Sequence, residues 1–222
     1  MGAGLWEQVD GYCERVDLTF WAEPANALTN LAFLLAAWVM WRRSHGPGAP
    51  LARALSAVMV VIGLASGLFH TLATNWAGAA DSLSILVFIL LYIYATNRGI
   101  WEQRPWPAFW AMWLFVPFVA VTAPALAMVL PLGSSAAYAS VPLLIVIEAA
   151  LMWRFAPATA RGFLLGATIL SVSITLRILD EPLCAVIPTG THFLWHILNA
   201  IMLGWMIEVY RRHMLASARA PR

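Results

Sequence analysis

The feature that most constrains this chain is a repeated alternation of long apolar segments with short polar ones. A helix needs about 20 mostly apolar residues to cross the hydrocarbon core of a membrane. Seven segments approach this requirement, and they cover residues 25–41, 54–72, 82–97, 106–122, 136–153, 162–179 and 191–210. We therefore predict an all-α integral membrane protein built as a bundle of seven transmembrane helices.

The composition indicates that lipid is the solvent of this bundle. Hydrophobic residues make up 62% of the chain and charged residues 11%, whereas about a quarter of the residues in a soluble domain are charged. The formal net charge of +2 gives no reason to expect nucleic acid as a partner, and nothing in the sequence predicts a particular oligomeric state. We predict three parts: an acidic N-terminal segment (1–24), a seven-helix domain (25–212) and a short tail (213–222).

The fourth and fifth segments are separated by helix-breaking residues alone. Residues 105–147 carry no charge. We divide them at Pro124, Pro131 and residues 133–135, because proline and glycine disfavour a continuous helix. A long re-entrant segment is the alternative here.

Charge alternates between the two ends of the predicted bundle. The acidic N-terminal segment, Asp81 and Asp180-Glu181 fall at one end, so the positive-inside rule places the N-terminus outside and the C-terminus in the cytoplasm. All thirteen basic residues are Arg, which favours a bacterial source and therefore a bacterial inner (cytoplasmic) membrane. The arginines that we place at the cytoplasmic end are Arg42, Arg43, Arg53, Arg98, Arg104, Arg154, Arg161, Arg211, Arg212, Arg219 and Arg222.

The chain has two cysteines, and both fall at the predicted outer end. Cys13 lies in the N-terminal segment and Cys184 in the connection before the seventh span. Outside the cytoplasm a disulfide between them is plausible. The alternative is two free buried thiols, since cysteine often behaves as a small hydrophobic residue.

Ionisable residues inside membrane spans are costly and indicate function by default. His192 and His196 are spaced i, i+4, which places both imidazoles on one face of a helix. His70, near the outer end of the second span, would complete three protein ligands with an open position, as in catalytic zinc sites. Imidazole ligands also suit copper, iron or nickel. Ser66 lies four residues before His70, and Asp81 opens the third span at the same level.

Other interpretations of these histidines remain. In one of them, the pair binds neighbouring carbonyl groups in a structural polar cluster. Paired histidines also ligate haem, but two imidazoles one turn apart cannot lie on opposite faces of one macrocycle. Glu148 and Arg177 are interpreted as structural, either paired with each other or with Arg177 reaching Asp180.

Several motifs occur together and in order. Ser66-Gly-Leu-Phe-His70 is followed by Asp81 and later by His192-Phe-Leu-Trp-His196. The N-terminal segment contains Asp10-Gly-Tyr-Cys-Glu14 and then Phe-Trp-Ala-Glu23-Pro-Ala-Asn26. With these motifs, over about residues 10–205, the chain resembles the alkaline ceramidase family. That family belongs to a wider group of seven-span membrane hydrolases that includes the progestin and adiponectin receptor relatives.

The resemblance implies a zinc-dependent hydrolase that cleaves the amide bond of ceramide to a sphingoid base and a fatty acid. It implies zinc ligands at His70, His192 and His196, a functional polar pair at Ser66 and Asp81, and a disulfide between Cys13 and Cys184. It also implies a calcium site in the N-terminal segment. Here the chain departs from the family pattern, with Tyr12 in place of Trp, an extra residue after Asp10, and Val16 in place of Asn. The calcium ligands expected in this chain are Asp10, Glu14, Asp17 and Glu23.

On this hypothesis Asp81 is the general base and Ser66 stabilises the oxyanion, or Asp81 instead orients an imidazole. A ceramide-like membrane lipid would enter from the outer leaflet. Two rival functions remain, an amidase acting on another N-acyl lipid and a zinc-containing receptor without turnover.

Overall fold

The computed structural model describes residues 4–219, and in that range the regular secondary structure is helical apart from one isolated β-bridge between Gln8 and Thr74. Residues 220–222 of the predicted tail lie outside the described part. The elements in chain order are α1 (Pro24–Thr29), α2 (Leu31–Arg43), α3 (Ala49–Leu72), α4 (Asn75–Gly99), α5 (Pro105–Trp113), α6 (Phe115–Ala127), η1 (Gly133–Ser135), α7 (Ala136–Met152), α8 (Pro157–Ile178), α9 (Asp180–Leu183) and α10 (His192–Ser217).

The prediction of seven membrane-spanning helices is confirmed. Among the described residues, seven helical stretches are long and apolar enough to cross a membrane, with α1–α2, α5–α6 and η1–α7 each forming one stretch. The predicted bounds were approximate, and two of them differ most from the structure. The third span begins at Asn75 rather than at residue 82, and the last continues to Ser217, into the predicted tail.

The early start of α4 has a local cause. Only Ala73 and Thr74 separate α3 from α4, and Ala73 ends α3 in the left-handed conformation with φ of 45°. Because the turn is so tight, the small residues that follow it already lie within the helix. Asp81 therefore lies nearly two turns inside α4 instead of opening it.

Two of the stretches are interrupted, each at a residue that disturbs helical hydrogen bonding. Asn30 separates α1 from α2, and its side-chain Nδ2 donates to the Asn26 carbonyl at 2.8 Å. Leu114 separates α5 from α6. It is followed by Pro117, which has no N–H to donate to the carbonyl of Trp113 four residues earlier.

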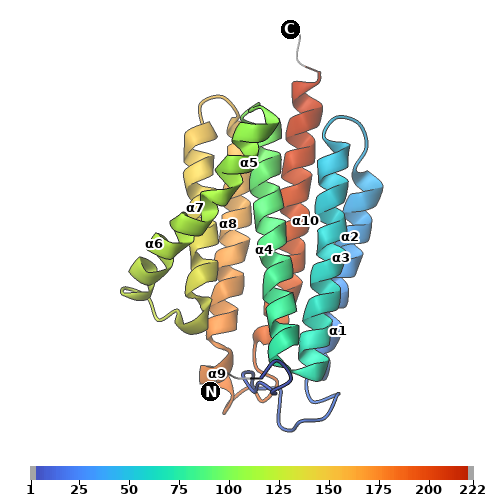
Figure 1. Ribbon diagram of the computed structural model, residues 1–222, viewed down its shortest axis with the longest axis vertical. Coiled ribbons are helices and arrows are strands. Elements are labelled where there is room, and N and C mark those ends of the chain that lie inside the picture. Colours follow the sequence, from blue (N-terminus) through green and yellow to red (C-terminus); the bar gives the residue numbers. More distant parts are fainter. Residues whose placement is uncertain (1–3, 220–222) are drawn as a thin grey trace.

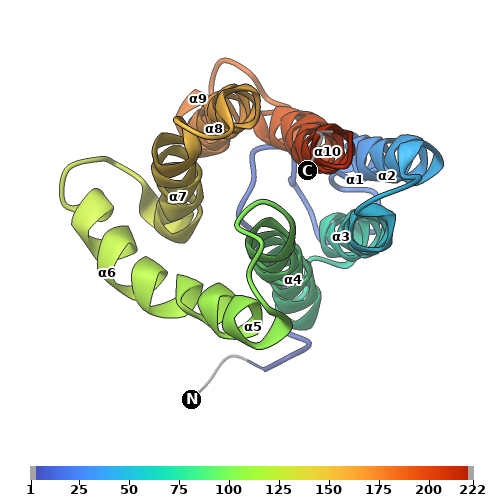
Figure 2. The ribbon, with the colours of Figure 1, turned by 90° about the horizontal axis from the view of Figure 1, so that it is seen from above.

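The helices form one bundle in which α10 packs against α8, α2 and α3, and α7 packs against α8. Seen from above, α10 lies between α8 and α2, while α5 and α6 lie at the outside between α4 and α7 (Figure 2). The N-terminal segment and α9 lie at the end of the bundle opposite the C-terminal end of α10 (Figure 1). The N-terminal segment is held against the α3–α4 turn, where Val9 N–H donates to Ala73 O at 2.7 Å. We call the end of the bundle that carries the N-terminal segment, the α3–α4 turn and α9 the loop end.

Candidate metal centre

Three histidines from opposite parts of the chain converge at the loop end of the bundle. His70 lies in the last turn of α3, whereas His192 and His196 lie in the first two turns of α10. Each offers a ring nitrogen, and these three nitrogens lie within 4.8 Å of one another. The three side chains are buried, with relative exposures of 1%, 2% and 1%. Among the described residues, this is the one group of His, Cys, Asp or Glu side chains with the geometry to hold a metal ion.

The hydrogen bonds of the imidazoles leave nitrogens free for a metal. Nδ1 of His70 lies 2.6 Å from Oε2 of Glu23, and Nδ1 of His196 lies 3.0 Å from Oγ1 of Thr29. Nε2 of His196 and Nδ1 of His192 are buried without a hydrogen-bond partner. Unpaired buried polar atoms are rare and need an explanation. A metal ion provides one, because it would satisfy nitrogens that the protein leaves unpaired.

The donor set fits a borderline transition metal. Three imidazoles suit zinc, copper, iron or nickel and do not suit magnesium or calcium. The ring centroids lie 4.6–5.1 Å apart, which leaves no room for a haem between them. Glu23 acts as the outer partner that fixes the ring of His70, a common arrangement around protein metal ions.

Glu23 is itself held by a buried ion pair. Nε of Arg15 lies 2.5 Å from Oε1 of Glu23, and both side chains are at most 3% exposed. Arg15 also donates to the backbone carbonyl of His70 at 3.3 Å. Burial alone would raise the pKa of Glu23, but its contacts with His70, Asn26 and Arg15 outweigh burial and lower that pKa. Glu23 therefore stays ionised and locked against His70.

Asp180 fixes the start of α10, a role that sequence reasoning missed. Its Oδ1 accepts hydrogen bonds from the backbone N–H groups of Thr191 at 2.6 Å and His192 at 2.8 Å. Its Oδ2 accepts from Cys13 N–H at 3.0 Å. Gly190 precedes this helix start with φ of +63°, and a Cβ there would collide with the Asp180 carboxylate. The available signal in the sequence was an acidic residue in the connection before the histidine pair, together with Gly190 two residues ahead of His192.

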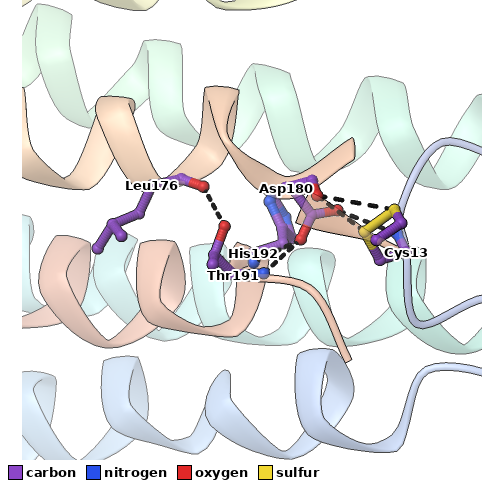
Figure 3. Close-up of a disulfide and its surroundings, with 6 residues drawn as sticks. Cys13, Leu176, Asp180, Thr191 and His192 are labelled. Atoms are coloured by element: carbon purple, nitrogen blue, oxygen red, sulfur yellow. Dashed lines mark hydrogen bonds between the residues drawn. A yellow bond between two sulfur atoms is a disulfide. The ribbon is translucent and has the colours of Figure 1, made fainter. Parts of the chain in front are cut away.

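A disulfide joins the same two regions. Cys13 and Cys184 are bonded, with their Cα atoms 5.2 Å apart, across 171 positions of sequence. Figure 3 shows the bond beside Asp180, Thr191 and His192. The neighbouring Tyr12 stacks on His192, with ring centroids 3.8 Å apart. The N-terminal segment thus forms one wall of the three-histidine group.

The two predicted catalytic residues lie beside this group. Ser66 and Asp81 line a small pocket of about 50 Å³ together with His196. We call it the apolar pocket, because most of its other lining residues are aliphatic or aromatic. Ser66 is 3% exposed, and it lies in α3 one turn before His70. The structure therefore brings Ser66, Asp81 and the histidines together.

Two further spaces adjoin Asp81 and its neighbours. The polar cavity, about 300 Å³, is lined by Asp81, His192, Tyr12 and Arg177 among others. The lateral groove, about 420 Å³, lies between α4, α6 and α7. All three spaces share Ile85 and Tyr138 in their linings. The three spaces therefore adjoin one another around these two side chains, from the histidine group to the side of the bundle.

Glu148 and Arg177 do not form the contacts considered from the sequence. The Glu148 carboxylate accepts a hydrogen bond from Trp101 Nε1 at 2.8 Å, near the opposite end of the bundle. Arg177 instead donates to Ser134 and Ser135. Asp180 is occupied by backbone N–H groups, so it is not the partner of Arg177 either.

The four predicted calcium ligands are not gathered into one group. Glu14 accepts from the N–H groups of Ala25 and Asn26 at 2.6 and 2.8 Å, at the N-terminus of α1. Asp17 is exposed and accepts from Thr19, which lowers its pKa. Glu23 faces His70, and Asp10 is exposed. The calcium site therefore stays a prediction.

Comparison with known proteins agrees with this architecture. A comparison with curated protein sequences gave no match. The model of the ceramidase family, by contrast, matches residues 10–220, which is nearly the whole chain. The matched range includes all three histidines, both cysteines, Ser66 and Asp81. The chain belongs to the ceramidase family.

Proposed function

We propose that this protein is a zinc-dependent intramembrane amide hydrolase that cleaves ceramide-type lipids to a sphingoid base and a fatty acid. The observation that carries the proposal is the convergence of three buried imidazoles beside Asp81 and Ser66. Family membership supports a hydrolase acting on an amide bond and a substrate of the ceramide kind.

The number of ligands favours catalysis over a structural metal. Structural zinc sites are normally closed by four protein ligands, whereas catalytic sites keep one position open. Within residues 4–219, no fourth His, Cys, Asp or Glu joins the three histidines in a ligand group. This supports an enzyme rather than a receptor without turnover.

The reaction adds water across the amide bond. The water oxygen bonds to the carbonyl carbon, the carbon–nitrogen bond breaks, and the nitrogen leaves with a proton as the amine. A zinc ion bound by the histidines would supply an acidified water and polarise the carbonyl group. Asp81 accepts the proton of the attacking water and transfers it to the leaving nitrogen. Ser66 donates a hydrogen bond to the oxyanion, a contribution of about 2.7–4 kcal/mol where such donors have been removed.

The surrounding spaces support entry of a lipid from the membrane. The lateral groove is bordered by Leu86, Phe115, Val116 and Val119, which suit an acyl chain. It shares Ile85, Ile89 and Val141 with the apolar pocket. A substrate can therefore keep its tails in an apolar setting while the amide reaches Asp81.

Mass spectrometry of lipid products tests this function. Purified protein, reconstituted in lipid and loaded with zinc, is incubated with ceramide. We expect equimolar sphingoid base and fatty acid, and we expect Asp81→Asn to release neither at a comparable rate. Intact ceramide after prolonged incubation with metal-loaded, folded wild type would contradict the proposal.

A further inference from the structure

Arg177 is a cation near the candidate site that forms no direct ion pair with the residues that the structure describes. It lies in the last turn of α8 and lines the polar cavity together with Asp81 and His192. Among the described residues, no Asp or Glu oxygen lies within 4.0 Å of its guanidinium nitrogens. Asp81 lines the same cavity but lies beyond this distance, so no direct ion pair closes off the guanidinium.

The guanidinium is fixed in place by neutral groups. Its Nη1 donates to Ser134 Oγ at 3.0 Å and to Ser135 Oγ at 2.5 Å. Its Cζ lies 5.4 Å from the ring centroid of Tyr138 and 5.7 Å from that of Trp195. Hydroxyl and aromatic contacts orient a cation without neutralising it. The Tyr12 side chain, in the same cavity, also lies against the guanidinium.

The spaces around Asp81 differ in character. The apolar pocket and the lateral groove have mostly hydrocarbon linings, whereas the polar cavity contains Tyr12, Asn75, Ser82 and Arg177. The polar cavity also lies at the loop end, where a bundle in a membrane meets the headgroup region. An N-acyl lipid whose amide is at Asp81 would therefore place its acyl chain in the apolar spaces and its amine-side headgroup in the polar cavity.

We infer that Arg177 binds an anionic headgroup, so that the preferred substrates are N-acyl lipids with an acidic group close to the amide nitrogen. A carboxylate, phosphate or sulfonate matches the planar donor fork of arginine, which a single neutral hydroxyl cannot do. The inference rests on the proposed amide hydrolysis and specifies its substrate class. Arg177 acts here as a specificity residue that contacts the substrate.

Two amides that differ only in the headgroup test the inference. N-oleoylglycine ends in a carboxylate, and N-oleoylethanolamine carries a hydroxymethyl group in its place. Since a hydrogen bond to a charged group contributes about 1.5–3 kcal/mol, we expect wild type to prefer the glycine amide by about tenfold or more in kcat/KM. Arg177→Gln should remove this preference, because kcat/KM for the glycine amide falls by about tenfold more than kcat/KM for the ethanolamide.

The controls separate charge from folding. Arg177→Lys keeps the charge and should retain part of the preference. Arg161→Gln removes an exposed arginine near the other end of the same helix and should change nothing. A wild type without preference for the carboxylate, or equal losses on both amides in a folded Arg177→Gln, would overturn the inference.

Binding provides a second readout that does not depend on turnover. We expect N-oleoylglycine to raise the melting temperature of the wild type more than N-oleoylethanolamine does. Equal shifts with the two lipids would overturn the inference, even if Arg177→Gln failed to fold. If the protein cleaves ceramide but does not prefer N-oleoylglycine to N-oleoylethanolamine, the inference is overturned and the proposed function stands. Failure to cleave ceramide and both amides would overturn the proposed function, whereas selective binding would still support the headgroup site.

Discussion

Oε2 of Glu23 lies 2.6 Å from Nδ1 of His70, and both side chains are almost completely buried. Because this contact occupies Nδ1, the other ring nitrogen of His70, Nε2, stays available for a metal ion. It also ties the residue before the first span to the last turn of α3. Glu23, expected from family resemblance to bind calcium, is thus positioned to act on the histidine site.

We predict that Glu23→Gln weakens zinc binding by about 10–100-fold, the usual effect of losing an outer partner of a metal ligand. Competition with a chromogenic chelator measures this affinity. Glu7→Gln, at an exposed position of the same segment, is the matched control and should bind zinc as wild type does. Unchanged zinc affinity in Glu23→Gln would show that the contact is not functional.

The histidines and the polar pair should respond differently to substitution. His70→Ala, His192→Ala and His196→Ala each remove one of three ligands, so each should strip or greatly weaken the metal. Asp81→Asn and Ser66→Ala should keep full zinc while turnover falls by orders of magnitude. Elemental analysis beside an activity assay separates the two groups. Histidine variants with full zinc would exclude this site, and full turnover in Asp81→Asn would exclude the proposed base.

Asp180→Ala should lower both thermal stability and zinc occupancy. The substitution leaves the N–H groups of Thr191, His192 and Cys13 without their acceptor, and an unpaired buried group costs about 1–3 kcal/mol. The melting temperature and the zinc content of the purified protein are the measurements. Glu181→Ala changes an exposed acidic neighbour in α9 and should leave both unaffected. Equal behaviour of the two variants would argue against a special role for Asp180.

The orientation of the bundle in the membrane is a further prediction. We expect a single added cysteine at exposed position Val186 or Pro188 to react with a membrane-impermeant thiol reagent on intact cells. Added cysteines near Arg104 and Ala158 should react only after the membrane is opened. Labelling of Ala158→Cys but not Val186→Cys in intact cells would invert the topology.

Calcium binding by the N-terminal segment can be tested separately from zinc. If Asp10 and Asp17 contribute carboxylates, millimolar calcium should raise the melting temperature. The double substitution Asp10→Asn and Asp17→Asn should abolish this rise. An identical melting temperature of zinc-loaded wild type with and without calcium would argue against the site.

The sequence predicted the spans and the histidine group because both depend on local patterns. Apolar length identifies a membrane helix, and i, i+4 spacing places His192 and His196 on one face. Asp81 was placed at the start of its helix because residues 75–80 hold one large apolar side chain, Trp76, and otherwise polar or small residues that give little hydropathy signal. The two-residue turn after α3 instead draws them into α4.

Contacts between distant parts of the chain were beyond the reach of such patterns. The link from Asp180 to Cys13 spans 167 positions, and that from Glu23 to His70 spans 47. Arg177 was interpreted as structural, with Glu148 or Asp180 as its partner. The Asp180 carboxylate instead accepts a hydrogen bond from the His192 N–H group at the start of α10. Arg177 donates to the two serines before α7.

The disulfide and the histidine group together set an order of assembly during synthesis. His70 and Glu23 leave the ribosome early, whereas Cys184, His192 and His196 come from the last quarter of the chain. A nascent chain with six inserted spans therefore has one of the three histidines of the candidate metal centre. On the proposed mechanism, hydrolysis can begin only after the seventh span supplies the other two. An incomplete or stalled translation product would then be unable to cleave the lipids around it.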